Sequence, residues 1–267
     1  MSRQKESTAR TLLVALIVCL VCSVFVASAA ITLKPIQTQN RLLDRQRTLL
    51  AIAGLGTPEM SDTAVRRLYT ERVSARVVDL QTGLFSDAHN PSTFDARRAA
   101  RDPELSDELP NSQDLASIGR RERFSVVYLV KQDGQLQTLI LPVRGAGAWG
   151  TIYGFIALQS DLNTVVGLGF YQHSETPGLG GEIDNPNWRA LWHGKSLFDA
   201  SGALAVQIIH GTVNPQSANA RHQVDGLAGA TLTSRSVHNL LHFWLGENGF
   251  APLLVNLQRL NQPAGGA

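Results

Sequence analysis

An uninterrupted apolar stretch near the N-terminus, residues 12–33, restricts this chain more than any other feature. The stretch contains no charged residue and few polar ones. Its roughly 22 residues, at the helical rise of about 1.5 Å per residue, match a bilayer core of about 30 Å. The sequence therefore predicts one transmembrane helix over residues 12–33, preceded by a short cytoplasmic segment, residues 1–11.

A cleaved signal peptide is the alternative interpretation of this stretch. Arg3, Lys5 and Arg10 form a basic start, and residues 27–29, Ala-Ser-Ala, resemble a cleavage site of small residues. The apolar run continues past that site to Leu33, beyond the usual length of a signal core, and this favours a retained anchor. Positive charges lie on both sides of the span, so their count does not decide its orientation.

Both cysteines of the chain, Cys19 and Cys22, fall inside the predicted span. The remaining chain therefore has no thiol for a disulfide or a cysteine metal site. We interpret the two cysteines as small residues within the membrane, with a thiol contact to a partner subunit or to a cluster in the membrane as the alternative. A net charge of +2 and the absence of a basic, aromatic-interleaved stripe argue against nucleic-acid binding.

The chain after the span alternates between helical and extended patterns. Residues 40–53 predict a connecting helix ended by Gly54, and residues 73–80 predict a strand. Residues 85–119 are rich in Asp, Asn, Pro, Ser and Arg with little periodicity. We expect a long surface loop there, either without a role or as a docking surface for a neighbouring protein of a complex.

From Phe124 onward the pattern becomes regular, as in an antiparallel meander with flanking helices. The expected strands are 124–131, 135–143, 152–159, 164–172 and 204–212, and the expected helices are 185–194, one beginning near 231, and 250–260. In the 185–194 helix, Trp188, Leu191 and Trp192 share one face. The tail from Gln262 is expected to fray. The fold class is therefore α+β.

A run of small residues, Asp225 to Ala230, leads into hydroxyl residues and then into an apolar stripe with helical spacing. Thr231, Thr233 and Ser234 are expected around the N-cap and first turn of that helix. Its free amides and positive dipole end favour an anion such as a phosphate, and Gly229 and Ala230 leave room for a bulky group. An ordinary N-cap behind a glycine turn is the alternative.

A second candidate stretch joins the end of the 164–172 strand to the next helix through a glycine-rich loop, Glu175 to Gly181. Glycines allow backbone to approach a flat ligand closely, although a simple turn is the alternative. Glu175 and Glu182 are interpreted as residues that order the loop, because their spacing fixes no paired-carboxylate geometry. His238 and His242 lie four residues apart on a helix, but Asn239 replaces the glutamate of a zinc motif, so no metal site is expected.

The two stretches together resemble a known family. Gly229-Ala-Thr-Leu-Thr-Ser resembles the flavinylation motif of the covalent FMN-binding domain family, and Glu175-Thr-Pro-Gly-Leu-Gly resembles that family's second signature. The extension Gly181-Glu-Ile-Asp-Asn-Pro-x-Trp is similar to the C-subunit family of the sodium-translocating NADH:quinone oxidoreductase. The resemblance includes the single N-terminal span and Lys34-Pro35. Ala228 departs from the motif, which has a Ser or Thr there.

This resemblance implies that Thr231 carries FMN through a phosphoester on the ribityl 5′-phosphate. It also implies that residues 121–260 form the FMN-binding domain, with residues 34–120 as a connecting helix and excursion and 261–267 as a frayed tail. The implied cofactor-binding residues are Thr231, Gly229, Ala230, Thr233, Ser234, Asp225, Glu175, Thr176, Pro177, Gly178, Leu179 and Gly180. No catalytic or metal residue is implied.

The implied function is electron relay from NADH toward ubiquinone, coupled to sodium export, within an expected six-subunit complex. The chain would be an enzyme only as part of that complex, since no nicotinamide site is visible. A flavin transferase would attach the FMN, and the domain would lie on the periplasmic side of a bacterial inner membrane. Two alternatives are the G-subunit of an Rnf-type electron-transport complex and a non-redox, membrane-tethered flavin-binding module.

Overall fold

The computed structural model describes residues 8–57 and 59–261. Its internal contacts divide the chain into two compact units, one ending at Arg45 and the other beginning at Gln46. The predictions for Arg3, Lys5 and the tail from Gln262 lie outside the described residues. Asn261, placed in the tail by sequence, ends the last helix.

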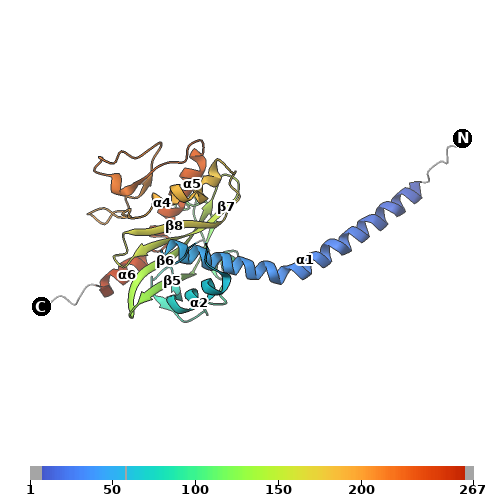
Figure 1. The fold of residues 1–267 in the computed structure, drawn as a ribbon, viewed down its shortest axis with the longest axis horizontal. Helices are drawn as coiled ribbons and strands as arrows, with labels where there is room; N and C mark the ends of the chain where they lie inside the picture. Colours follow the sequence, from blue (N-terminus) through green and yellow to red (C-terminus); the bar gives the residue numbers. More distant parts are fainter. Residues whose placement is uncertain (1–7, 58, 262–267) are drawn as a thin grey trace. The chain divides into compact units, whose positions relative to one another are not determined.

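Helix α1, Thr8–Ile52, is continuous through the predicted span and the predicted connecting helix (Figure 1). The sequence predicts these as two separate helices, and the structure joins them into one. Pro35 lies inside the helix, where it removes only one backbone donor, and the turns on either side continue. Among the described residues, α1 is the one helix long and apolar enough to cross a membrane, and its apolar window is exposed. The boundary of the span at Leu33 stays a prediction.

The second unit is built on an antiparallel sheet, of which Figure 1 labels β5 to β8. The sheet has six strands in the order β2-β1-β5-β6-β7-β8. Its strands are β1 Val73–Asp79, β2 Phe85–Ser86, β5 Phe124–Gln132, β6 Gln135–Ala146, β7 Thr151–Gln159 and β8 Val165–Gln172. The expected meander from Phe124 is confirmed, since β5 to β8 are consecutive neighbours. The class is α+β.

The central strands bury side chains on both faces of the sheet, because consecutive residues are apolar and successive side chains point to opposite faces. On β6, Leu139 and Leu141 belong to one core, whereas Ile140 belongs to the other. Helices α5, Thr231–Leu245, and α6, Ala251–Asn261, contribute to the first core. The last turns of α1 contribute Leu49 and Ile52 to the second core.

Two local features fix the ends of the helices in this unit. A Cβ at Gly167 of β8 would lie 2.7 Å from the carbonyl oxygen of Ile52, so only glycine lets the end of α1 rest on that strand. Helix α2, Asp62–Arg72, has Ser61 as its N-cap. The Ser61 side chain accepts a hydrogen bond from the Ala64 amide.

The 85–119 segment is more structured than the sequence predicts. It contains β2, α3 Ala96–Ala99 and β3 Ser106–Glu108, and β3 pairs with β4 Arg120–Glu122. Strand β2 extends the main sheet through β1, and Ala99 and Ala116 are buried. The sequence does not predict these strand pairings, because the segment is polar and strands of two or three residues show no clear periodic pattern. A docking role for this segment stays a prediction.

The chain between β8 and α5 contains several short elements. They are η1 Gly180–Asp184, α4 Pro186–Ala190, β9 Gln207–Ile208, η2 Ala220–His222 and β10 Gln223–Val224. The prediction of a strand over 204–212 is wrong except at β9, which forms a two-stranded sheet with β10. Trp188 and Trp192 are buried as expected, but Leu191 is exposed, because the helix ends before it can share their face.

Candidate functional site

Helix α5 begins at Thr231, as the glycine turn and apolar stripe predict, but its cap differs from the prediction. The N-cap is Ala230, which makes no side-chain cap hydrogen bond, so Thr231, Thr233 and Ser234 all lie inside the helix. The apolar stripe of α5 is buried in the core at Val237, Leu240, Leu241, Trp244 and Leu245. The first turn therefore presents amides that no capping side chain satisfies.

The three hydroxyls of this turn have different surroundings. Thr231 is exposed. Thr233 is only 2% exposed, and its hydroxyl donates to Glu175 Oε2. Ser234 is 8% exposed, and its hydroxyl accepts a 2.9 Å hydrogen bond from the Leu227 amide. Of the three, only Thr231 is exposed.

The turn before α5 is held in place by Asp225. Its carboxylate accepts a hydrogen bond from the Val213 amide at 2.8 Å, and its carbonyl accepts one from the Trp188 indole at 2.9 Å. Gly229 has a φ of +72°, which a glycine adopts without strain. A Cβ there would lie 3.3 Å from Leu179, so this turn touches the second signature loop.

The loop over residues 175–180 is a tight turn packed against the start of α5. The Thr176 carbonyl accepts hydrogen bonds from the amides of Leu179 and Gly181, and the side chains of Thr176 and Pro177 are exposed. Gly180 is buried, and a Cβ there would collide with Thr233 Oγ1 and lie 2.6 Å from Glu175 Oε2. Gly180 is thus required by packing within the protein. Gly178 has a φ of +75°, and contact of either glycine with a flavin stays a prediction.

The turn between β6 and β7 contributes a side chain that the sequence motifs do not indicate. The amide of Trp149 donates a 3.2 Å hydrogen bond to Glu175 Oε1, and its side chain is 73% exposed. Two further apolar residues are exposed: Leu179 in the signature loop and Leu232, which follows Thr231 in α5. A tryptophan among glycines in residues 145–150 was the available sequence signal.

A groove of about 700 Å³ opens beside Thr231 along α5. Ligand sites of drug-sized molecules span roughly 300–1,000 Å³, so the groove has the size of such a site. Its polar lining includes Arg235, which lies one helical turn after Thr231 and was not predicted. The other lining residues are Gln207, Ile208, Ile209, His210, Gly211, Thr212, Asp225, Gly226, Leu227, Ala228, Gly229, Ser234, His238 and His242.

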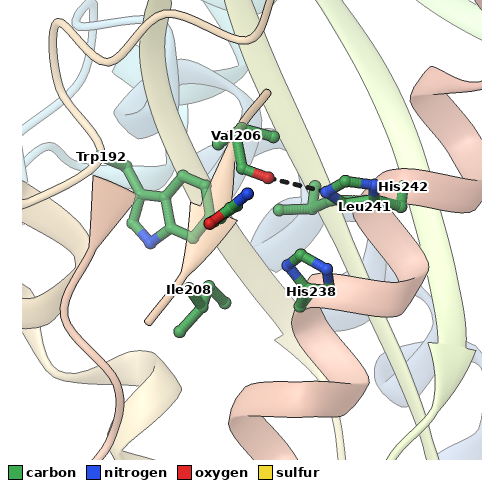
Figure 2. A pocket seen from close by; sticks show the side chains of 7 residues that line it. Trp192, Val206, Ile208, His238, Leu241 and His242 are labelled. Carbon is green, nitrogen blue, oxygen red and sulfur yellow. Dashed lines mark hydrogen bonds between the residues drawn. The ribbon is translucent and has the colours of Figure 1, made fainter. Parts of the chain in front are cut away.

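His238 and His242 also line the groove. They lie on the side of α5 that faces Val206 and Ile208 (Figure 2). Their ring centroids are 4.1 Å apart, and His242 Nε2 donates to the Val206 carbonyl at 2.7 Å. Desolvation by burial, and then the neighbouring His242, lower the pKa of His238 to about 4. His238 is therefore neutral at pH 7. The described residues contain no group of three or more potential metal ligands.

Comparison with known proteins identifies the family. The FMN-binding domain family model matches residues 147–246, which hold β7, β8, both signatures and α5. The C-subunit of the Na(+)-translocating NADH-quinone reductase from Pseudomonas aeruginosa is 67% identical over 255 residues, 96% of this chain and 98% of that protein. This chain belongs to the C-subunit family of the Na(+)-translocating NADH-quinone reductase. The Yersinia pestis member is 49% identical over 96% of this chain and 95% of that protein.

The fold agrees with solved members of the same family. The crystal structure of NqrC from Shewanella oneidensis has a TM-score of 0.75 at 34% identity, over 83% of this chain and 99% of that chain. The C-subunit from Parabacteroides distasonis has a TM-score of 0.61 at 27% identity, over 86% of this chain and 98% of that chain. The predicted resemblance to the C-subunit family is confirmed, and the Rnf-type and non-redox alternatives are not favoured.

Proposed function

We propose that this chain is the membrane-anchored flavoprotein component of a sodium-translocating NADH:quinone oxidoreductase, and that Thr231 carries its FMN through a phosphoester. One observation supports the attachment residue most strongly: Thr231 has the exposed hydroxyl at the uncapped start of α5. Thr233 and Ser234 are buried, and their hydroxyls are occupied. Flavin, when bound, supplies the electron-accepting and electron-donating chemistry.

The residues around Thr231 fit a phosphate. The first amides of α5 and the positive end of its dipole favour an anion, and Arg235 adds a cation on the same side of the helix. The positive φ of Gly229 and its lack of a side chain leave the backbone open on the approach to Thr231. Ala228 supplies no hydroxyl, so backbone donors and Arg235 take a larger share of phosphate binding in this chain.

The apolar residues beside Thr231 fit the flat ring of a flavin. Leu179 and Trp149 are both exposed. The Trp149 amide is bonded to Glu175, and Leu179 lies beside Gly229 in the turn before α5. We assign the ring to this side of Thr231, against the loop formed by Glu175, Thr176, Pro177, Gly178, Leu179 and Gly180. Exposed aromatic and aliphatic groups are suited to cover an apolar ring system, which loses water on contact.

The anchor and the partners complete the proposal. Residues 12–33 cross a bacterial inner membrane once, with the FMN-binding domain on the periplasmic side. The chain passes electrons from NADH toward ubiquinone as one of six subunits and is not an enzyme alone. A flavin transferase attaches the FMN from FAD: the Thr231 oxygen bonds to the phosphorus of the FMN part, the bond from that phosphorus to AMP breaks, and AMP leaves. The named relatives are components of such a reductase, which supports this assignment.

Expression of the full chain with and without a flavin transferase tests the proposal. With the transferase, the denatured chain should show in-gel flavin fluorescence and a mass increase of one FMN, because a phosphoester survives denaturation. Without it, the chain should be colourless. Copurification with the other reductase subunits, and flavin reduction on adding NADH to that complex, should follow. A chain that stays colourless with an active transferase, or a flavin that NADH does not reduce in the complex, would refute it.

A further inference from the structure

Glu175 occupies an unusual position for a carboxylate in this fold. It is 5% exposed, and among the described residues it forms no salt bridge. A buried carboxylate is costly unless donors satisfy it. Its two oxygens have separate donors: Oε1 accepts from the Trp149 amide at 3.2 Å, and Oε2 accepts from the Thr233 hydroxyl.

These two donors come from segments that are distant in sequence. Trp149 lies in the turn between β6 and β7, and Thr233 lies in the first turn of α5. Glycines make room for the carboxylate on both sides. A Cβ at Gly147 would collide with Oε1, and a Cβ at Gly180 would lie 2.6 Å from Oε2. The backbone is therefore shaped around this one side chain.

The base of Glu175 is held independently. Its amide donates a 3.1 Å hydrogen bond to His173 Nδ1, and His173 Nε2 lies 2.8 Å from Asp184 Oδ2. The carboxylate thus extends from an anchored backbone position toward both donors. Glu175 has the reach to hold the two segments at once, and an aspartate, one methylene shorter, does not.

From this arrangement we infer that Glu175 is a positioning residue that fixes the Trp149 turn to the Thr231 end of α5. Both oxygens are used within the protein, so the carboxylate of Glu175 acts on the flavin site through Trp149 and Thr233, while other atoms of the loop lie against the ring. The effect on the flavin rests on the proposed function, whereas the tie between the two segments does not.

Two variants of the full chain separate reach from charge. Glu175→Asp keeps the charge and loses the reach. Glu175→Gln keeps the length and loses the charge, and its amide can still accept from Trp149 while donating to the Thr233 hydroxyl, which can also accept. Positioning predicts that Glu175→Gln resembles the natural protein and that Glu175→Asp does not. A purely electrostatic role predicts the reverse.

Amide hydrogen exchange at Trp149 is the readout that needs no flavin. Its hydrogen bond to Glu175 is the contact that protects this amide, so Glu175→Asp should exchange about tenfold faster there, and Glu175→Gln about as slowly as the natural protein. Thr233→Val is the matched control, because it leaves Oε1 and the Trp149 amide untouched. Equal exchange in Glu175→Asp and the natural protein would overturn the inference.

The flavin supplies the second readout, on chains loaded by the transferase. Glu175→Asp should keep its covalent FMN but show a shifted flavin absorbance maximum and altered quenching of flavin fluorescence, because the Trp149 turn moves. Glu175→Gln should restore both. If the natural chain carries no flavin on Thr231, the proposed function fails while the exchange experiment still tests the tie. If Glu175→Asp loosens Trp149 without changing the spectra, positioning of the flavin site is refuted.

Discussion

Thr233 Oγ1 donates a hydrogen bond to Glu175 Oε2, although 58 residues separate the two in sequence. This contact joins the two segments that the sequence identifies as flavin signatures. The Thr233 hydroxyl is buried and bonded to Glu175, which supports our proposal that the cofactor is attached at another hydroxyl. Thr231, two residues earlier, remains exposed at the helix start.

Thr231→Ala is expected to abolish covalent flavin in a host that supplies the transferase. The change should alter the unfolding free energy by no more than about 0.5 kcal/mol, since the side chain is exposed. Intact mass and in-gel fluorescence check the first expectation, and chemical denaturation of the colourless chain checks the second. Retained FMN mapped by peptide analysis to Thr233 or Ser234 would show that the attachment is on a different hydroxyl.

Thr233→Val should leave the flavin attached but reduce stability by about 1–3 kcal/mol. Valine fills the same space, yet one oxygen of the buried Glu175 carboxylate loses its donor. The loss should equal or exceed the roughly 1 kcal/mol typical of a removed N-cap, which is the alternative role that the sequence leaves open. Urea denaturation of the detergent-solubilised chain measures it, with Thr233→Ser, which keeps the hydroxyl, as the control.

Gly180→Ala and Gly178→Ala should each destabilise the chain, but for different physical reasons, although the two glycines belong to one loop. A methyl group at Gly180 meets Thr233 and Glu175, so we expect a loss of about 1–3 kcal/mol, as in other overpacked cores. At Gly178 nothing lies within 4 Å of a Cβ, and only the positive φ opposes alanine, at about 1–2 kcal/mol. Thermal unfolding compares them. A flavin spectrum changed by Gly178→Ala alone would place the ring near Gly178.

The lowered pKa of His238 predicts a loss of stability in mild acid. Its pKa is about 4 in the folded chain and about 6.5 when unfolded, so below pH 6.5 the unfolded chain binds a proton that the folded chain does not. Stability should be unaffected above pH 6.5 and should fall progressively toward pH 4. Because His238 is only half-buried, the effect is on the order of 1 kcal/mol. In His238→Gln, denaturation midpoints at pH 7.5 and pH 5 should differ less than in the natural chain.

The N-terminal helix should be retained in the mature protein. The apolar run of α1 extends past the Ala-Ser-Ala site, and its side chains are exposed in the described structure. Intact mass of the membrane-extracted chain should include residues 12–33, and a chain lacking residues up to Leu33 should remain in the soluble fraction. N-terminal sequencing that begins at Ala30 would show cleavage instead.

Much of the fold follows from local pattern. Strands β5 to β8 have strong runs of apolar and β-branched residues between turn residues, and α5 has a clear apolar stripe, so both were predictable. The short pairing within 204–212 and the continuity of α1 through Pro35 were not. A two-residue strand depends on its partner β10, and a helix can continue through one proline when the turns on both sides are favourable.

The candidate site divides in the same way. Thr231 and the 175–180 loop carry local motifs, whereas Trp149 and Arg235 become site residues only through where the chain folds. Trp149 is identified as a site residue by the hydrogen bond from its backbone amide to Glu175, 26 residues later. Arg235 is identified by its position on the side of α5 that lines the groove. Neither contact leaves a periodic signal in the sequence.

The sequence by itself predicted the apolar N-terminal helix, the strands of the antiparallel meander and the start of α5, because each depends on residues within one turn or strand. Its family resemblance implied Thr231 as the attachment residue. Tertiary structure alone decided which hydroxyl is exposed, why Gly180 is a glycine, and that the carboxylate of Glu175 bonds to both Trp149 and Thr233. The physical reason is that burial and hydrogen bonding of these groups depend on neighbours from distant segments, which meet only when β7, the signature loop and α5 pack together.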